Sequence, residues 1–467
     1  MKSKMHLAID IGASSGRHIL GWQKDGMLHL EEVHRFPNSM TQTDGCLCWD
    51  VDALFDEIIT GMKKCAVLGK IPVSVGIDTW GADYVLLDKN GNRIGPAFAY
   101  RDSRTEDTYS EVFKCMPEDE LYARTGIHKL VFNTINQLMA AKIKTPHLLE
   151  NARHLLMIPD YLHYKLCGAM KTEYTDASTG GLLNALTKNW DDEIIARCGF
   201  PREIFCELVP AGTVLGELTD DIKRVVGYGC TVVMPPSHDT ASAFLAVPAK
   251  SENSIYISSG TWSLMGVELS SPITTDAARI AHFTNEGGYD FRIRFLKNIM
   301  GLWILQSVQR EIAQGISFAE IADLARASQY DGLIDANDER FFAPQSMTKT
   351  ITDACRENGH AEPQGLGDIA RCIYRSLAAS YAHTVKQLES LTGKRYDYIN
   401  IIGGGSANMY LNELTAAACG MPVLAGPSEG TALGNIVSQM IAYEDLPDIA
   451  TAREAIRRSF DIREILP

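Results

Sequence analysis

One short pattern occurs twice in this chain. Residues 9–17 read Ile-Asp-Ile-Gly-Ala-Ser-Ser-Gly-Arg, residues 255–262 read Ile-Tyr-Ile-Ser-Ser-Gly-Thr-Trp, and each lies between apolar runs. Each copy is typical of a strand, a turn of small residues and a second strand. Glycine tolerates backbone angles that other residues resist, and free N–H groups beside hydroxyls form a loop that can hold an anion. Either copy alone is most simply a hairpin, but the repetition predicts two related domains that hold a polyphosphate between them.

The size of the chain agrees with two domains. It has 467 residues, of which 45% are hydrophobic and 22% are charged, which is more than one typical domain uses. A polar stretch at residues 248–253 precedes the second copy of the pattern, and we expect the domain boundary there. The predicted organisation is a domain at residues 1–247, a second at 253–445 and a tail at 446–467.

Charge and cysteine content limit the partners and the compartment. The net charge of −14 and the lack of a dense Lys/Arg run argue against nucleic-acid or anionic-membrane partners. No apolar stretch is long enough for a transmembrane helix, and the N-terminal apolar run is too short for a signal peptide. Eleven cysteines, an odd number, favour a reducing compartment, so we expect the cytoplasm. The sequence does not decide whether Cys355 and Cys372 form a disulfide.

Periodicity predicts an α/β fold. In the first half, apolar runs indicate strands at residues 5–11, 17–22 and 73–77, and residues 51–68 have helical spacing. In the second half, apolar residues at helical spacing predict a helix over 368–391. A buried strand at 398–402 then leads through the glycines of residues 403–406 into a helix over 411–419. The order of strand, glycine turn and helix is typical of a site where a flat ligand binds close to the glycine backbone. The alternative is a tight turn that binds no ligand.

Two aspartates follow apolar strands. Asp239 lies beside His238 and Thr240, between the strand at residues 231–234 and a helix of small residues. A carboxylate there suits a hydroxylated ligand and can take a proton from a hydroxyl that attacks phosphorus, whereas the simpler alternative is a helix N-cap. Asp10 directly precedes the first anion loop, where a carboxylate would repel phosphate unless a cation lay between them. We therefore expect Asp10 to bind Mg²⁺ directly or through water, the alternative being a turn-stabilising role.

A third segment, residues 76–84, places Asp78, Asp83 and two aromatic residues around Gly81. Aromatic faces and carboxylates match the apolar faces and polar edges of a sugar. A hairpin with Trp80 in the core is the competing explanation.

Together these motifs resemble the FGGY carbohydrate kinases. The resemblance rests on residues 10–17, 76–81, 237–242, 259–263 and 403–406, and it spans nearly the whole chain. Within the family, Ala13 to Arg17, the Asn-Glu-Gly-Gly run at 285–288 and residues 296–303 point to the group that phosphorylates L-rhamnulose. One departure is Ala407, where the family often has a larger polar residue, and it puts one nucleotide contact in doubt.

The resemblance implies two actin-like, ribonuclease H-like domains around a cleft for ATP and a sugar. It implies that a nucleotide-binding set contacts ATP, namely Ala13, Ser14, Ser15, Gly16, Arg17, Thr261, Gln306 and Gly404. It also implies that a second set contacts the sugar, namely Gly81, His238, Asp239, Thr240 and Asn298. Asp239 is the expected proton acceptor.

The implied reaction transfers the γ-phosphoryl group of ATP to the 1-hydroxyl of L-rhamnulose, in L-rhamnose catabolism. The expected partners are therefore a small ketose and ATP with Mg²⁺. Two alternatives stay open. One is a kinase for another ketose, such as L-fuculose or xylulose, because such sugars differ by little. The other is a nucleotide-gated sugar sensor without transfer activity.

Overall fold

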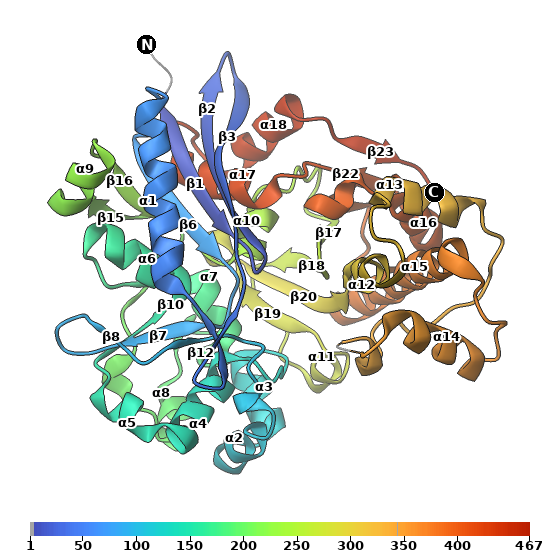
Figure 1. Ribbon diagram of the computed structural model, residues 1–467, viewed down its shortest axis with the longest axis horizontal. Coiled ribbons are helices and arrows are strands. Elements are labelled where there is room, and N and C mark those ends of the chain that lie inside the picture. The colour runs from blue at the N-terminus through green and yellow to red at the C-terminus, as the bar shows by residue number, and fades with distance from the viewer. Residues whose placement is uncertain (1–3, 343) are drawn as a thin grey trace. The chain divides into compact units, whose positions relative to one another are not determined.

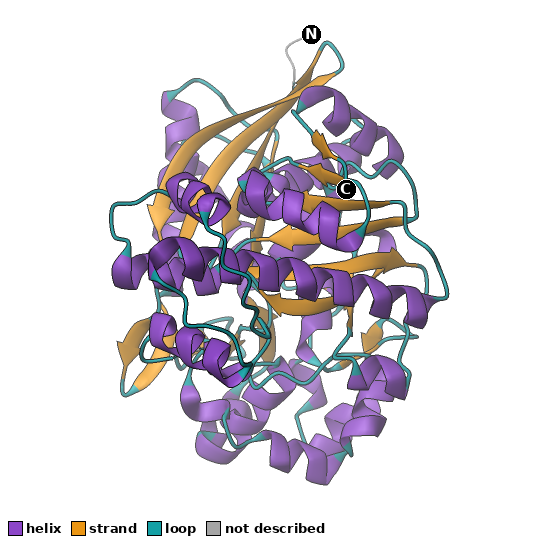
Figure 2. Ribbon diagram, turned by 90° about the vertical axis from the view of Figure 1, so that its right-hand side faces the viewer, coloured by secondary structure: helices purple, strands orange, loops and turns teal. Residues whose placement is uncertain are grey.

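The computed structural model describes residues 4–342 and 344–467. The chain folds as two compact units, and it contains both helices and strands (Figure 2). The first unit comprises the chain up to Ala246 together with residues 268–295 and 431–459, and the second comprises 247–267, 296–430 and 460–467. This agrees with the predicted α/β class. Because both units take segments from distant parts of the chain, the predicted continuous domain ranges stay a prediction.

A six-stranded sheet forms the centre of the first unit (Figure 1). Its strands, in spatial order, are β15 (Thr213–Glu217), β16 (Thr231–Met234), β6 (Ser74–Thr79), β1 (Met5–Ile11), β2 (Ser15–Lys24) and β3 (Met27–Pro37). Strands β1 and β2 form the hairpin expected at residues 9–17, and β6 runs parallel to both β1 and β16. The carboxyl ends of β1, β6 and β16 therefore meet at one edge of the sheet, where open α/β sheets bind ligands.

Helices cover the sheet and extend the first unit. Strand β1 is an apolar run because it is central and buried: Leu7, Ala8, Ile9 and Ile11 are all 0% exposed. The helices are α1 (Val51–Val67), α2 (Tyr109–Cys115), α3 (Glu118–Thr125), α4 (Thr134–Lys144), α5 (Pro146–Asn151), α6 (Ile158–Cys167), α7 (Tyr174–Ala177), α8 (Asp192–Cys198), α9 (Asp220–Val226), α10 (Asp239–Leu245), α11 (Asp276–Ile280), α17 (Gly430–Ala442) and α18 (Ile449–Ser459). The short strands are β4 (Thr41–Thr43), β5 (Cys46–Trp49), β7 (Tyr84–Leu87), β8 (Arg93–Ile94), β9 (Ala97–Phe98), β10 (His154–Met157), β11 (Thr172–Glu173), β12 (Leu183–Asn184), β13 (Asn189–Trp190), β14 (Leu208–Val209) and β19 (Thr284–Gly287).

The second unit repeats the central pairing of the first. Strands β18 (Trp262–Leu269), β17 (Ser254–Ser259), β21 (Tyr398–Ile402), β22 (Val423–Ala425) and β23 (Arg463–Ile465) are neighbours in that order. Strands β17 and β18 form an antiparallel hairpin at the second copy of the pattern, and β17 runs parallel to β21. Both copies of the repeat are therefore hairpins that flank a parallel strand.

Helices complete the second unit. They are α12 (Trp303–Ile312), α13 (Phe318–Ala327), α14 (Met347–Glu357), α15 (Gly365–Thr392) and α16 (Met409–Cys419), and strand β20 (Ile293–Met300) leads into this set. Helix α15 contains the predicted segment 368–391 and ends before Gly393, whose positive φ of 68° suits glycine. Among the described residues, no helix has both the length and the apolar character that a membrane crossing requires.

Helix α17 returns to the first unit near the end of the chain and bonds to its central strands. Asn435 donates to the carbonyl of Gly76 on β6 (3.1 Å), and Gln439 donates to the carbonyl of Leu7 on β1 (2.9 Å). At the neighbouring Gly434, a Cβ atom would lie 1.8 Å from the carbonyl oxygen of Ser242 on α10. The backbones of α17 and α10 therefore approach so closely that only glycine fits at residue 434.

We predict that Gly434→Ala destabilises the protein by about 1–3 kcal/mol, because α10 or α17 must move to accept the methyl group. The same movement would displace Asp239, the first residue of α10. The control is Gly229→Ala, where the nearest atom lies at an ordinary 3.5 Å. Thermal or urea unfolding of both variants measures the effect, and equal midpoints would contradict the close approach.

Candidate active site

A row of charged side chains crosses the sheet at its carboxyl edge. Asp10 on β1 lies in register with Arg17 on β2 and with Asp78 on β6. The Nε and Nη2 atoms of Arg17 donate to Oδ2 of Asp10 at 3.0 and 2.8 Å. Arg17 thus neutralises Asp10 within the first unit, and the strand pairing holds Asp78 beside it.

Asp78 is buried and only partly hydrogen-bonded. Its side chain is 0% exposed, and its Oδ2 accepts a hydrogen bond from Nδ2 of Asn435 at 2.6 Å. The Oδ1 atom has no partner among the described residues. Burial, and next the charge of Asp10, raise the pKa of Asp78 well above its usual range. Burial and the neighbouring charge therefore both oppose ionisation of Asp78.

Asp239 begins helix α10, directly after the loop that follows β16. The N-cap of α10 is His238, so the alternative that Asp239 is a helix cap is wrong. The Asp239 side chain is 32% exposed, and its Oδ1 accepts a hydrogen bond from Oγ1 of Thr240 at 3.0 Å. Burial and then the charge of Asp10 raise the pKa of Asp239 to about 7. A carboxyl group with this pKa can accept a proton near neutral pH.

Glu173 holds the loop that precedes Asp239. Its Oε2 accepts hydrogen bonds from the backbone N–H and the hydroxyl of Ser237, at 3.0 and 2.8 Å. The same oxygen accepts from the backbone N–H and hydroxyl of Thr175. The Thr175 hydroxyl in turn accepts from the backbone N–H of His238 at 3.3 Å. One buried carboxylate thus fixes the backbone on which His238 and Asp239 stand.

The His238 ring is held on two sides. Its Nδ1 lies 3.0 Å from Nη2 of Arg294 and 3.5 Å from Oε2 of Glu286, and its Nε2 lies 3.5 Å from Oδ1 of Asp239. Burial, and then the Arg294 charge, lower the pKa of His238 well below its usual value. His238 is therefore neutral beside Asp239.

Gly81 approaches the same ring, whereas the tryptophan beside it belongs to the core. A Cβ atom on Gly81 would lie 3.4 Å from Cδ2 of His238. Trp80 is 6% exposed, and its indole N–H and that of Trp49 donate to Oδ2 of Asp83 at 2.9 and 2.7 Å. Burial raises the pKa of Asp83 to about 6. Trp80 therefore lies in the core, as the competing explanation expected, but the segment is not a hairpin, because β6 and β7 belong to different sheets. Thr79 also forms a backbone bridge to His238, so both Thr79 and Gly81 lie beside that residue.

The first anion loop is a tight turn between β1 and β2. The backbone N–H of Gly12 donates to the carbonyl of Ser15 at 2.9 Å, and the Asn38 amide donates to the carbonyl of Gly12 at 2.9 Å. Ala13 is half-buried and Ser14 is exposed at the tip, while Gly16 is buried on β2. The tip therefore presents backbone and hydroxyl groups to solvent.

Three residues of the predicted nucleotide-binding set, Thr261, Gln306 and Gly404, belong to the second unit. The carbonyl of Thr261 accepts from the N–H of Trp303 at 3.0 Å, at the start of the helix that carries Gln306. The glycine turn packs against the other side of this hairpin, because a Cβ atom on Gly405 would lie 1.9 Å from the Ser259 hydroxyl. At Gly404, by contrast, a Cβ atom would meet nothing within 4 Å. Thr261 and Gly404 are both exposed.

Asn298, which belongs to the predicted sugar-binding set, and Ala407 also lie in the second unit. Asn298 lies on β20 and is half-buried, and Ala407, the departure from the family pattern, is exposed in the short turn of helix after Gly403.

The thiols of Cys355 and Cys372 are free, with their Sγ atoms 3.7 Å apart.

The donor set at the sheet edge suits a hard divalent cation. Asp10 offers carboxylate oxygens, which are the ligands that Mg²⁺ prefers, and the neighbouring Asp78 has one oxygen without a partner among the described residues. No group of three or more His, Cys, Asp or Glu side chains in the described part of the chain is arranged to hold a metal ion by itself. Any cation here would therefore keep water or phosphate ligands, and the role of Asp10 stays a prediction.

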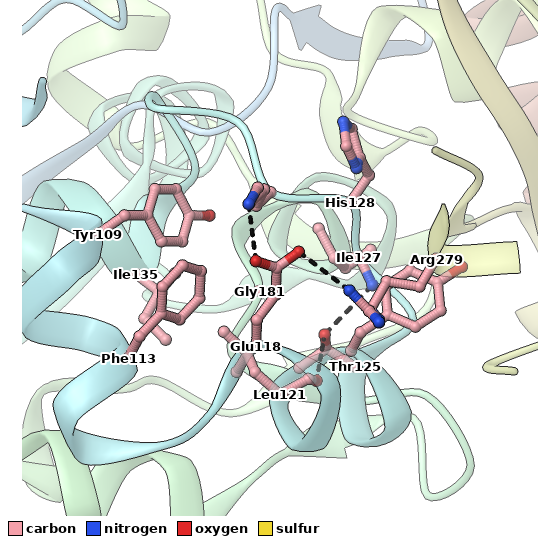
Figure 3. A pocket seen from close by; sticks show the side chains of 12 residues that line it. Tyr109, Phe113, Glu118, Leu121, Thr125, Ile127, His128, Ile135, Gly181 and Arg279 are labelled. Carbon is pink, nitrogen blue, oxygen red and sulfur yellow. Dashed lines mark hydrogen bonds and ion pairs between the residues drawn. The ribbon is translucent and has the colours of Figure 1, made fainter. Parts of the chain in front are cut away.

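A separate pocket of the first unit contains none of the predicted residues. Aromatic side chains, including Tyr109 and Phe113, form part of its wall (Figure 3). The Glu118 carboxylate projects into it and pairs with Arg279 at 3.4 Å (Figure 3). It also pairs with Lys129 at 2.7 Å. Because these charged side chains already pair with one another, we do not assign the active site to this pocket.

Sequence reasoning missed three charged residues of the site: Glu173, Glu286 and Arg294. Glu286 lies in the Asn-Glu-Gly-Gly run, which was recognised only as a marker of the family group. Arg294 follows eight residues later, and both reach His238 from a segment about fifty residues further along the chain. The sequence signal for Arg294 was an arginine within an apolar strand-like run, because a charge at such a position requires polar partners.

Models of two protein domains match the chain. The N-terminal domain of the FGGY family of carbohydrate kinases matches residues 5–246, and its C-terminal domain matches residues 255–443. A rhamnulokinase from Oceanobacillus iheyensis is 45% identical over 457 residues, covering 98% of this chain and 97% of that protein. A rhamnulokinase from Bacillus subtilis is 42% identical over 465 residues, covering 99% of this chain and 95% of that protein.

Solved structures share the fold at low sequence identity. A xylulose kinase from Lactobacillus acidophilus superposes with a TM-score of 0.80 at 14% identity, covering 99% of this chain and 94% of that one. A glycerol kinase from Plasmodium falciparum, solved with ADP, has a TM-score of 0.79 at 15% identity, covering 98% and 94%. Together with the domain matches and the full-length relatives, these likenesses show that the chain belongs to the FGGY family of carbohydrate kinases.

Proposed function

We propose that this chain transfers the γ-phosphoryl group of ATP to the 1-hydroxyl of L-rhamnulose, forming L-rhamnulose 1-phosphate in L-rhamnose catabolism. The observation that carries this proposal is the 45% identity to a rhamnulokinase over 98% of the chain. The Asp239 site supports it, because the site provides a neutral histidine donor and a carboxyl group with a pKa of about 7 side by side.

Asp239 is the proton acceptor in this proposal. The sugar hydroxyl loses its proton to the carboxylate as its oxygen attacks the γ-phosphorus, and the bond from phosphorus to the oxygen of ADP breaks. Thr240 orients the carboxylate through its hydroxyl. Gly81, His238, Thr240 and Asn298 are the proposed sugar contacts.

The two hairpins of the repeat are the proposed phosphate-binding elements. In the first unit, residues 13–17 form the loop with Ser14 exposed at its tip, and in the second unit Thr261 and Gly404 are exposed while Gln306 is half-buried. Open space at Gly404 supports contact with a flat ring there. A protein catalyses phosphoryl transfer mainly by positioning the reactants and neutralising their charge, and the two hairpins are suited to both tasks.

Mg²⁺ is the proposed cation, held by Asp10 directly or through water. When bound, it would neutralise charge on the phosphate oxygens. Arg17 limits the repulsion between Asp10 and phosphate through its ion pair with that carboxylate. We also propose a cytoplasmic location, which the eleven free thiols support.

An assay of ADP release tests the function directly. We expect ADP formation to depend on L-rhamnulose, with lower kcat/KM for L-fuculose and xylulose, and NMR of the product should place phosphate on C1. A preference for another ketose would favour the alternative kinase, because a methyl group in a pocket is worth only about 1–3 kcal/mol. Nucleotide binding without ADP release on any ketose would favour the sensor and overturn the proposal.

We predict that Asp239→Asn lowers kcat by about 10²–10⁴-fold, because the amide cannot accept the proton. Binding of the sugar should change little, since the side chains have the same shape. Asp221→Asn, on an exposed carboxylate of α9, is the matched control and should retain activity. Steady-state kinetics and sugar titration by calorimetry separate the two effects, and near-normal turnover in Asp239→Asn would contradict its role.

The raised pKa of Asp239 predicts a pH dependence in the free enzyme. The base is active only when deprotonated, so kcat/KM should level off above about pH 8, reach half its maximum near the pKa of about 7 and fall below it. The slope should approach about tenfold per pH unit, as expected for one proton. Rates between pH 5 and 9, with stability checked at each pH, give the profile. If kcat/KM fell only near pH 4, burial and the charge of Asp10 would not raise the pKa of Asp239, and the prediction would be wrong.

A further inference from the structure

Arg294 is a fully buried cation whose side chain reaches the proposed sugar site. It lies at the start of β20, within the first unit, and is 0% exposed. Its Nε donates to the carbonyl of Gly287 at 2.7 Å, and its Nη2 lies 3.1 Å from Oε2 of Glu286. The same Nη2 lies 3.0 Å from Nδ1 of His238. The guanidinium is thus anchored by backbone and carboxylate while one N–H group points at the histidine ring.

This contact determines where the proton of His238 lies. A guanidinium has five N–H donors, no acceptor, and keeps its charge at all accessible pH values. The Nδ1 atom facing Arg294 must therefore accept, so it carries a lone pair and no proton. The single proton of the neutral ring then sits on Nε2. Nε2 is the atom on the Asp239 side, 3.5 Å from its Oδ1.

We propose that Arg294 is a positioning residue that holds His238 in the neutral Nε2–H form, so that His238 donates a hydrogen bond to the substrate hydroxyl that Asp239 deprotonates. This inference rests on the proposed function. The hydroxyl oxygen accepts from Nε2–H while its own proton points to the carboxylate. The contact orients the oxygen lone pair toward phosphorus, and His238 ends the step unchanged.

The charges around His238 explain why neutrality matters. Arg294 and Glu286 face Nδ1, Asp239 faces Nε2, and Glu173 holds the adjoining backbone through Ser237. An imidazolium at this position would pair with the Asp239 carboxylate and weaken it as a base. The Arg294 charge, next to burial, keeps the pKa of His238 low and so prevents this pairing.

Three variants test the inference in the full-length protein. Arg294→Met removes both donor and charge, and Arg294→Lys keeps the charge but cannot reach Gly287, Glu286 and His238 together. Arg124→Lys is the control, because Arg124 pairs with Asp191 at 2.9 and 3.0 Å and with Glu193 at 2.8 Å, and none of these partners is assigned to the reaction. Melting temperatures identify any variant that does not fold, and if Arg294→Met is one of these, Arg294→Lys carries the same measurements.

The first readout is the protonation of His238, from long-range ¹H–¹⁵N spectra of ¹⁵N-histidine-labelled protein, with His238→Gln to assign the ring. We expect a single Nε2–H form from pH 6 to 8 in the parent and in Arg124→Lys. In Arg294→Met the ring should lose its single form and exchange between the Nε2–H and Nδ1–H tautomers. An unchanged His238 spectrum in both Arg294 variants would overturn the inference.

The second readout is kinetic. Arg294→Met should lower kcat/KM for L-rhamnulose by about 10- to 100-fold, as loss of a charged hydrogen-bond partner does, with KM for ATP unchanged. In a His238→Gln background the same change should add little, because Arg294 acts through His238. Full additivity of the two effects would contradict that route. If the parent protein phosphorylates no ketose, the proposed function fails, whereas the spectra still decide the Arg294–His238 contact.

Discussion

The parallel pairing of β1 with β6 places two carboxyl groups, Asp10 and Asp78, side by side at the edge of a buried sheet. Like charges at such a position are unfavourable, and the surrounding residues reduce the cost in two different ways. Arg17 pairs with Asp10 from the neighbouring strand, while Asn435 supports Asp78, whose burial favours the uncharged form. The raised pKa of Asp239 follows from the same crowding, since Asp10 is its second cause after burial.

A second charge arrangement, around Arg294, complements the first. Asp10, Asp78 and Asp239 make the sheet edge acidic, and Arg294 supplies a buried positive charge on the other side of His238. Glu286 and the carbonyl of Gly287 hold that cation in place. The site thus keeps an acidic side and a basic side apart with one neutral ring between them. That separation is what lets a carboxylate act as a base without being paired.

Local patterns predicted the framework well. The apolar runs predicted β1 and β21 at their observed bounds, and helix α1 differs from its predicted range only by its last residue. Strands and hairpins of this kind are specified by hydrophobic period and turn residues, both of which are local. The family resemblance is confirmed by the domain matches. The placement of Asp239 after a strand was predictable for the same local reason, whereas Asp10 lies within β1 and does not follow it.

What the sequence did not reveal depends on contacts between distant segments. The roles of Glu173 and Arg294 arise only when residues more than fifty positions away pack against them. The helix-cap alternative for Asp239 failed because the cap position depends on the backbone of the preceding residue, which Glu173 and Thr175 hold. Trp80 was ambiguous because an aromatic residue suits both a core and a sugar site, and only its bond to Asp83 decides between them.

The return of α17 and α18 to the first unit has a consequence for the order in which the protein can form. Hydrogen bonds from Asn435 and Gln439 satisfy backbone carbonyls of β6 and β1, and Gly434 completes the packing of α10. Domains usually fold as units while the chain is synthesised from its N-terminus. Here the central sheet of the first unit lacks its partners until residues 431–459 leave the ribosome. The proton acceptor, which stands on α10, can therefore reach its final position only when synthesis is nearly complete.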